Sequence, residues 1–178
     1  MDAVTEARQM TGAAGTVTGI YVAKTAGAPM EALERARVVA GRGIEGDRYF
    51  DGHGYYSQVQ PLTGRRLTLI EGESLEALER ETGIVLGPDE CRRNLITRGI
   101  RLEYLIGRRF RVGEIECYGE RLCPPCGYLE KVTGKRGVNR GLTDRGGIRA
   151  EILLDGEITI GDEVTLSTIA PAAIPAPE

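Results

Sequence analysis

Polar and apolar residues alternate along several short segments of the chain, the pattern of β-strands with one buried face. The alternation is clearest over residues 17–23, 66–70, 109–112, 114–117 and 148–152. The last segment runs on to Leu154, and Asp155-Gly156 is a dipeptide typical of a type I′ hairpin turn. We therefore expect a hairpin there, with a strand over 157–160, a turn at Gly161-Asp162 and a final strand over 164–166. Many short strands with glycine turns predict a mostly β fold, a β-barrel or a sandwich, with a few short helices.

Two segments have helical character. Residues 74–82 place Leu75 and Leu78 on one stripe, and Gly83 follows where a helix C-terminal glycine is expected. Residues 124–133 begin with two prolines, which a helix accepts in its first turn, and Gly134 follows them. Residues 30–40 fit a helix by propensity and a strand equally well, so both remain open.

Composition and charge narrow the class of protein. The 25 glycines among 178 residues follow no period, so they fit turns rather than a fibrous repeat. The formal net charge is −3, without the basic surface typical of nucleic-acid binders. No apolar stretch is long enough to span a membrane, and the first residues lack the apolar core of a signal peptide. We expect a cytoplasmic protein that binds neither nucleic acid nor membrane.

The chain shows one shift in composition near each end. Residues 1–14 are typical of a flexible leader, and residues 169–178 form an Ala/Pro-rich tail. Between them there is no linker and no internal repeat, which predicts one domain over 15–168.

The most chemically suggestive motif is Cys123-Pro124-Pro125-Cys126. Cysteine reacts as the thiolate, and a helix N-terminus lowers the pKa of a thiol. If the prolines open the helix, Cys126 lies in its first turn, where a reactive sulfur is favoured. In a reducing compartment, four cysteines indicate thiol or metal chemistry rather than a disulfide framework.

Three alternative roles for the cysteines stay open. The Cys123–Cys126 pair can be buried and act as small apolar side chains. It can be a redox pair, although a thioredoxin-like motif should follow the first strand of a βαβ unit. A zinc site with Cys91 and Cys117 is the third, but only one pair has suitable spacing, and Cys117 fits the inward face of a strand.

Two polar clusters are candidates for ligand contacts. The loop over 41–49 contains Asp47 and Arg48, which either anchor a structural turn or contact an anionic ligand. Arg93 can clamp a phosphate with two parallel hydrogen bonds, and Asn94 can bond a heterocycle. Most arginines of the run Arg92, Arg93, Arg98, Arg101, Arg108 and Arg109 are expected to be solvated.

Two hydrolytic functions find little support. The chain has no G-x-S-x-G motif, which argues against a serine hydrolase. A Cys–His pair would need His53, for which an exposed loop position is the better prediction.

These clusters, in this order, resemble the MOSC family, named for the C-terminal domain of molybdenum cofactor sulfurases. The match runs from about Gly15 to Leu166. It rests on the order of the segments GRGIEGDRYF at 41–50, RRLTLIE at 65–71, RRNLITRGI at 92–100, LIGRRFRVG at 105–113, PPC at 124–126, RGGIRAEIL at 145–153 and GEITIGDEV at 156–164. No single segment is diagnostic, and their order and spacing carry the resemblance.

The resemblance implies a fold similar to the β-barrel domain of pyruvate kinases, and binding of molybdenum cofactor. Cys126 matches the family cysteine that carries sulfur or ligates molybdenum, whereas Cys123 is additional and suggests a resolving thiol. Arg93, Asn94, Asp47 and Arg48 fall in the family's polar motifs and are expected to line a pocket for a phosphate-bearing pterin. The chain lacks the pyridoxal-phosphate domain of full sulfurases, so we expect sulfur from a partner such as a cysteine desulfurase.

Two functions follow from this implication and stay open. As an enzyme, the protein would reduce N-hydroxylated compounds with electrons from a separate redox protein. As a carrier, it would hold a persulfide on Cys126. The alternatives are a thiol–disulfide redox protein that uses Cys123 and Cys126, and a ligand-binding barrel whose thiols are incidental.

Overall fold

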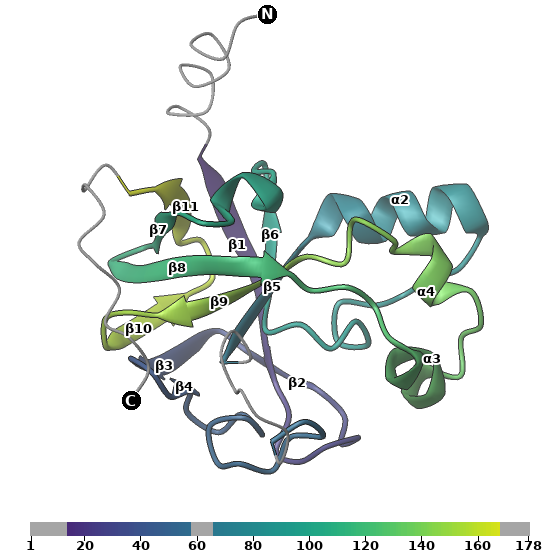
Figure 1. Cartoon of the computed structure of the whole chain (residues 1–178), viewed down its shortest axis with the longest axis horizontal. Coiled ribbons are helices and arrows are strands. Elements are labelled where there is room, and N and C mark those ends of the chain that lie inside the picture. Colours follow the sequence, from purple (N-terminus) through teal and green to yellow (C-terminus); the bar gives the residue numbers. More distant parts are fainter. Residues whose placement is uncertain (1–13, 58–65, 168–178) are drawn as a thin grey trace, which may run out of the picture.

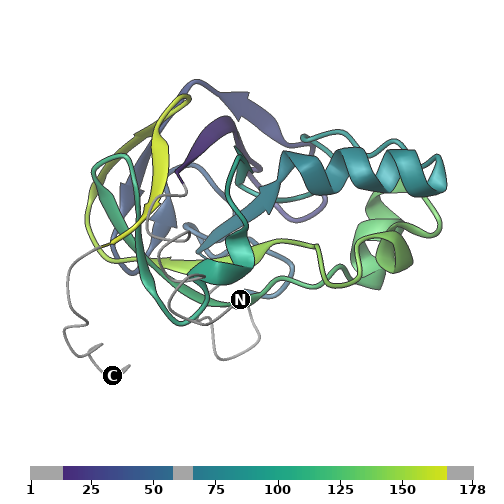
Figure 2. The same cartoon turned by 90° about the horizontal axis from the view of Figure 1, so that it is seen from above.

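The computed structural model describes residues 14–57 and 66–167. It is a β-barrel with its helices gathered at one end (Figure 1), and the view turned by 90° shows the same grouping (Figure 2). The strands are β1 (Gly15–Val22), β2 (Glu31–Leu33), β3 (Arg35–Val39), β4 (Gly43–Ile44), β5 (Leu67–Glu71), β6 (Leu95–Arg98), β7 (Arg109–Val112), β8 (Ile115–Leu122), β9 (Ile148–Ile152), β10 (Gly156–Thr159) and β11 (Glu163–Leu166). The helices are α2 (Gly72–Thr82), α3 (Gly127–Thr133) and α4 (Val138–Gly141), with a 3-10 turn η1 (Leu102–Leu105).

The main sheet closes on itself. Its order is β11-β7-β8-β9-β5-β6-β1-β2, and β11 also pairs with β1. Strands β5 and β6 are parallel, and the other pairs around the barrel are antiparallel. Closure leaves few open strand edges that could pair with other chains. The prediction of a mostly β barrel with a few short helices is confirmed.

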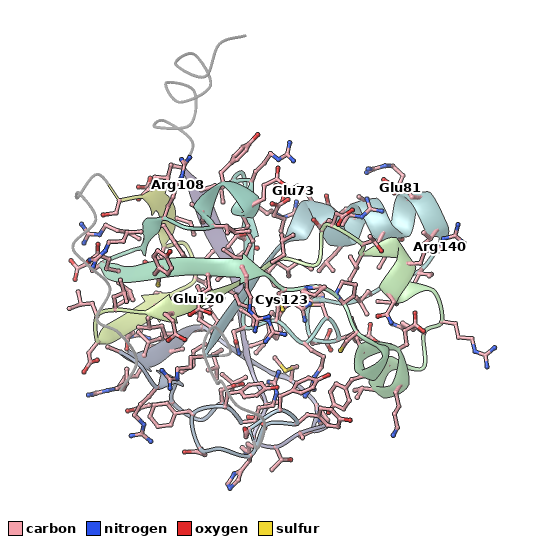
Figure 3. All side chains as sticks on the ribbon, viewed as in Figure 1. Glu73, Glu81, Arg108, Glu120, Cys123 and Arg140 are labelled. Carbon is pink, nitrogen blue, oxygen red and sulfur yellow. The ribbon has the colours of Figure 1, made fainter. Side chains whose placement is uncertain are left out.

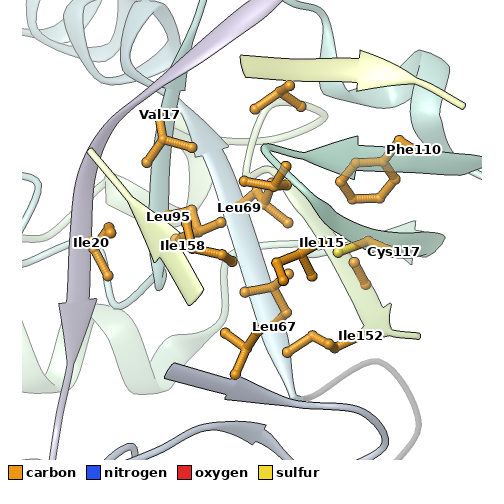
Figure 4. Close-up of a cluster of buried hydrophobic side chains, with 14 of the residues drawn as sticks. Val17, Ile20, Leu67, Leu69, Leu95, Phe110, Ile115, Cys117, Ile152 and Ile158 are labelled. Atoms are coloured by element: carbon orange, nitrogen blue, oxygen red, sulfur yellow. The ribbon is translucent and has the colours of Figure 1, made fainter. Parts of the chain in front are cut away.

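Alternating side chains fill the barrel. Along β9, Ile148, Ala150 and Ile152 are buried while the residues between them are partly exposed, as the period-two pattern predicts. Facing residues from the other strands, with Phe110 and Leu69 among the fully buried ones, pack against them (Figure 4). Each such side chain contributes roughly 1.5–3 kcal/mol when fully buried. Cys117 is one of these core residues, as predicted, and burial raises the pKa of its thiol.

A second apolar cluster packs the helices against the barrel. It joins Ile70 of β5 and Ile96 of β6 to Leu75 and Leu78 of α2. The cluster also includes Leu86, Cys91, Leu129, Val138 and Leu142. Gly83 adopts a left-handed conformation with φ of 72° and ends α2, as the sequence predicted, although α2 begins two residues before the predicted start at Ser74. This packing fixes α3 and the segment that precedes it.

The structure decides two predictions of local structure. The predicted hairpin at Asp155-Gly156 is wrong. Strand β10 does not pair with β9; it pairs with β3 in a separate sheet of order β10-β3-β4. Asp155 accepts a hydrogen bond of 2.7 Å from the backbone N–H of Ala40, which ties the connection to β3. The open choice over 30–40 resolves to strands, β2 and β3.

The predicted leader over 1–14 lies outside the described residues except for its last residue, and the tail over 169–178 lies wholly outside them. The domain boundaries at 15 and 168 therefore stay a prediction.

Candidate functional site around Cys126

Cys126 lies at the N-cap of α3, one residue before the helix begins. Its backbone is extended, with φ of −138° and ψ of 163°, and its carbonyl oxygen accepts a hydrogen bond of 2.9 Å from the Leu129 N–H. The prediction that the prolines open the helix is wrong. Residues 123–126 are not helical, and α3 starts at Gly127. A proline disfavours the helical region for the residue before it, which acts against a helical Pro124. Cys126 is half-buried, and its thiol is free.

Arg93 holds the loop that carries the two cysteines. Its Nε donates to the carbonyl oxygen of Gly146 at 2.9 Å, its Nη1 to that of Cys91 at 3.3 Å, and its Nη2 to that of Cys123 at 2.9 Å. The Cys123 N–H donates to the Gly147 carbonyl oxygen at 2.8 Å, and the Cys123 side chain is buried. All three of these hydrogen bonds from Arg93 go to backbone carbonyls, so Arg93 positions the loop that contains Cys123, which Figure 3 labels.

Asp47 and Asn94 form a buried network beside this loop. Asp47 Oδ1 accepts hydrogen bonds from Arg48 Nη1 at 3.1 Å and from the Ala23 N–H at 3.2 Å, and Asn94 Nδ2 approaches it at 3.4 Å. Asn94 Oδ1 accepts from the Thr68 hydroxyl at 3.0 Å. Asp47 thus forms an ion pair with Arg48 and also accepts hydrogen bonds from the backbone. The network joins the 41–49 loop to β1, β5 and the start of β6.

A cavity of about 70 Å³ opens beside Cys126. Its described lining contains four arginines and no carboxylate; the residues are Arg48, Tyr49, Tyr56, Thr68, Arg92, Arg93, Cys123, Pro124, Cys126, Tyr128, Leu129 and Arg149. The structure therefore brings Cys123, Cys126, Arg48 and Arg93 to one cavity. Asn94 and Asp47 support it from behind, since neither lines it. The cavity favours an anionic ligand near a thiol.

Arg92 lines this cavity and was not among the candidate site residues from the sequence. It is 7% exposed, and its backbone takes a left-handed conformation with φ of 63°. Its Nη1 donates to the carbonyl oxygen of Ala28, whereas Nε and Nη2 have no hydrogen-bond partner among residues 14–57 and 66–167. Burial is the main cause that lowers the pKa of Arg92, and the nearby positive charge of Arg48 lowers it further. The expectation that most arginines of this run are solvated holds for Arg98, Arg101 and Arg108, which are exposed, but not for Arg92.

Tyr56 and Tyr128 line the cavity near the thiol, and Tyr55 packs against both rings. The Tyr56 hydroxyl donates to the Cys126 sulfur at 3.9 Å. Burial raises the pKa of Tyr56, and the contact with Cys126 raises it further, so the phenol stays a protonated donor at neutral pH. Tyr55 packs edge-on to Tyr56 with ring centroids 4.8 Å apart and stacks on Tyr128 at 4.3 Å. The only sequence signal for this cluster was the Tyr55-Tyr56 pair in a polar loop.

The family model of the MOSC domain matches residues 53–165. The chain belongs to the MOSC domain family. The matched stretch contains Arg92, Arg93, Asn94, Cys123 and Cys126, whereas Asp47 and Arg48 precede it.

Several solved structures share the fold of this MOSC domain. YuaD from Bacillus subtilis matches with a TM-score of 0.72 at 18% identity, covering 86% of this chain and 95% of that one. YiiM from Geobacillus stearothermophilus matches with a TM-score of 0.64 at 13% identity, covering 86% of this chain and 75% of that one. YiiM from Escherichia coli matches with a TM-score of 0.64 at 16% identity, covering 88% and 72%. At these identities the likeness shows the fold alone. A search of curated proteins finds no match.

A larger cavity of this MOSC domain, of about 320 Å³, lies between α2 and strands β1 and β6. Leu75, Leu86 and Ile96 supply much of its lining, and Glu76 and Arg98 face each other there as an ion pair. Its described lining holds no cysteine or histidine. We place the candidate site in the smaller cavity, because that one contains a nucleophile and buried charge.

The described residues of the MOSC domain contain no group of three or more His, Cys, Asp or Glu side chains arranged to hold a metal ion. His53 is exposed on its loop, as expected. Within the same residues, no helix has the length and apolar character needed to cross a membrane.

Proposed function

We propose that this MOSC domain binds molybdenum cofactor through the thiolate of Cys126. The observation that carries the proposal is a half-buried free thiol at a cavity whose described lining contains four arginines and no carboxylate. A thiolate is a soft metal ligand, and guanidinium groups balance the negative charge of the cofactor. The family relationship supports the same assignment.

The residues present fit one end of the cofactor. Arg92 presents a buried guanidinium with two nitrogens that lack partners in the described chain, which is the environment an anionic group would complete. The cavity of about 70 Å³ is much smaller than the roughly 300–1,000 Å³ of pockets that enclose drug-sized ligands. It therefore accommodates the anionic end at Cys126 and not a whole pterin.

Each group of the site has a task in this proposal. Cys126 supplies the sulfur ligand, Tyr56 donates a hydrogen bond to that sulfur, and Arg92 compensates negative charge. Arg93 keeps the cysteine loop in place through its backbone contacts, and the pair of Asp47 and Asn94 holds the neighbouring loop. When bound, the molybdenum would supply the redox chemistry that removes oxygen from N-hydroxylated compounds.

The same thiol supports two forms of the proposal. In the enzyme form, Cys126 stays bound to the metal and electrons come from a separate redox protein. In the carrier form, Cys126 holds a persulfide that it received from a sulfur donor such as a cysteine desulfurase. In both forms we expect a cytoplasmic protein, because its four cysteines fit a reducing compartment better than a disulfide framework.

Elemental analysis tests the proposal. The protein is purified from a host that makes the cofactor, and molybdenum and labile sulfane sulfur are measured per chain for the natural sequence, Cys126→Ser and Cys123→Ser. Near-stoichiometric molybdenum that is lost only in Cys126→Ser supports the enzyme form. Sulfane sulfur without metal, lost in the same variant, supports the carrier form. Protein with neither, or equal losses in both variants, contradicts the proposal, and equal losses favour the thiol–disulfide alternative.

A further inference from the structure

Arg92 carries a buried positive charge that the described part of the protein does not neutralise. Its side chain is more than nine-tenths buried, and it donates a hydrogen bond to a neutral carbonyl oxygen, that of Ala28. The nearest buried carboxylate in this network, Asp47, already accepts hydrogen bonds from Arg48, two backbone N–H groups and Asn94. Buried charges in proteins are normally paired, because an unpaired one loses its hydration without compensation. An anion in the adjoining cavity would supply the missing partner.

Arg149 adds a further guanidinium group to the cavity, although its side chain as a whole is partly exposed. Its Nε is buried and has no hydrogen-bond partner among the described residues, and it lines the same cavity as Arg92. Arg48 also lines that cavity, with its single carboxylate contact to Asp47. These three guanidinium groups thus line a cavity whose described lining has no carboxylate, and Asp47, the partner of Arg48, lies behind that lining. A lining with this net positive charge favours an anionic ligand over a neutral one.

The size of the cavity restricts the anion. About 10–15 Å³ of such volume holds one water molecule, so a cavity of about 70 Å³ holds roughly five atoms of that size. A tetrahedral oxyanion has five non-hydrogen atoms. Planar guanidinium groups bind such oxyanions through paired N–H donors.

We propose that the cavity beside Cys126 is a binding site for a small tetrahedral oxyanion held by Arg92 and Arg149, and that thiosulfate uses this site to donate sulfur to Cys126. This inference rests on the carrier form of the proposed function, because both use the Cys126 thiol. Thiosulfate combines the two features that the site recognises, a sulfonate group for the arginines and an outer sulfur for the thiolate.

The transfer is balanced without a further oxidant. The Cys126 thiol first loses its proton to solvent. The thiolate then attacks the outer sulfur of thiosulfate, a new S–S bond forms at Cys126, and the S–S bond of thiosulfate breaks. The electron pair of the broken bond leaves with sulfite, which the arginines hold as it departs. Attack of a thiolate on a divalent sulfur is the chemistry of thiol–disulfide exchange, here with sulfite as the leaving group.

Binding without chemistry is tested first. Calorimetric titration of sulfate and of phosphate into Cys126→Ser measures the oxyanion site without the thiol. We expect both ions to bind, and Arg92→Met or Arg149→Met in that background to weaken binding about tenfold to a hundredfold. Arg80→Met, on the exposed face of α2, is the control and should leave the affinity unchanged. Equal affinity in all the variants overturns the oxyanion site. If the left-handed backbone at Arg92 prevents the Arg92→Met variant from folding, the sulfate and phosphate affinity of Arg149→Met decides whether the oxyanion site exists.

Transfer is tested next on the natural sequence. Thiosulfate should add the mass of one sulfur atom to Cys126, release one sulfite and be inhibited by phosphate, and Arg92→Met should slow the addition at low thiosulfate by at least about tenfold. Oxyanion binding with no sulfur added to Cys126 overturns thiosulfate as the donor. The two proposals fail separately, because molybdenum content reports on the cofactor and sulfate affinity reports on the arginines.

Discussion

The Arg93 guanidinium donates a hydrogen bond of 2.9 Å to the carbonyl oxygen of Cys123, a residue 30 positions further along the chain. Through this bond a buried cation at the start of β6 sets the position of the cysteine loop. The same side chain bonds the carbonyl oxygen of Gly146 at 2.9 Å, so the two segments that flank the cavity share one anchor.

Replacing Arg93 with Met should therefore destabilise the fold and loosen the loop. The change removes three hydrogen bonds to backbone carbonyls and leaves those carbonyls buried, which should lower the free energy of unfolding by about 2–4 kcal/mol. Urea denaturation measures the loss. Arg140→Met, at an exposed position of α4, is the matched control and should stay within about 0.5 kcal/mol of the natural protein. A neutral Arg93→Met would mean that the loop is held by other contacts.

The sequence predicted the strands far better than the site. Residues 148–152 alternate because one face of β9 fills the barrel, and this local signal survives folding. The prediction of a hairpin after this strand failed because β10 pairs with β3, which lies more than a hundred residues earlier in the chain. No local sequence pattern encodes such a pairing. The family motifs located Cys126, Arg93 and Asn94, but their contacts depend on the tertiary structure. Arg92 was missed for the same reason, since its burial and its hydrogen bond to Ala28 arise only in the tertiary structure.

Glu71 should make stability depend on pH in a direction unusual for a carboxyl group. Burial raises its pKa more strongly than the hydrogen bond from the Leu102 N–H lowers it. The folded protein therefore holds the proton to a higher pH than the unfolded chain, and stability falls as pH rises from the unfolded pKa through the folded one.

Glu71→Gln keeps an oxygen to accept the 2.7 Å bond from Leu102 and removes the ionisation. The variant should be more stable than the natural protein at neutral pH, and its advantage should disappear when the pH falls below the ordinary carboxyl range. Thermal unfolding between about pH 3.5 and 7, a range that brackets the unperturbed Glu pKa, measures the difference. The exposed Glu114→Gln serves as the control. An advantage that grows on acidification would reverse the assigned direction.

Gly147 is a position where any side chain should disturb the site. Its φ is 89°, and a Cβ there would lie 1.9 Å from the carbonyl oxygen of Leu69. Gly147→Ala combines left-handed strain with a clash against backbone, which should cost about 2–5 kcal/mol or prevent folding. Gly127→Ala provides the contrast, because a Cβ meets nothing within 4 Å there and the residue starts α3. Similar stability in both variants, measured by urea denaturation, would show that β5 and the Gly146-Gly147 segment can separate at little cost.

The four cysteines should differ sharply in reactivity. Cys126 is half-buried at the cavity, whereas Cys91, Cys117 and Cys123 are at most 3% exposed. Alkylation of the native protein should therefore modify Cys126 alone, and the other three should react only after denaturation, because a buried thiol is reached only through opening of the structure. Peptide mass mapping after a timed alkylation measures this order.

The same contrast separates the cofactor site from a thiol–disulfide pair. A redox pair needs both sulfurs, so Cys123→Ala and Cys126→Ala would abolish its activity equally. A site that works through one sulfur should keep its bound molybdenum or its sulfane sulfur in Cys123→Ala, with a modest loss of stability from the buried position, and lose them in Cys126→Ala. Because Arg93 contacts the backbone of Cys123 and not its sulfur, Cys123→Ala leaves that anchor intact. A loss of bound molybdenum or sulfane sulfur in a Cys123→Ala protein that is still fully folded would then point to the Cys123 sulfur and would make it a resolving thiol.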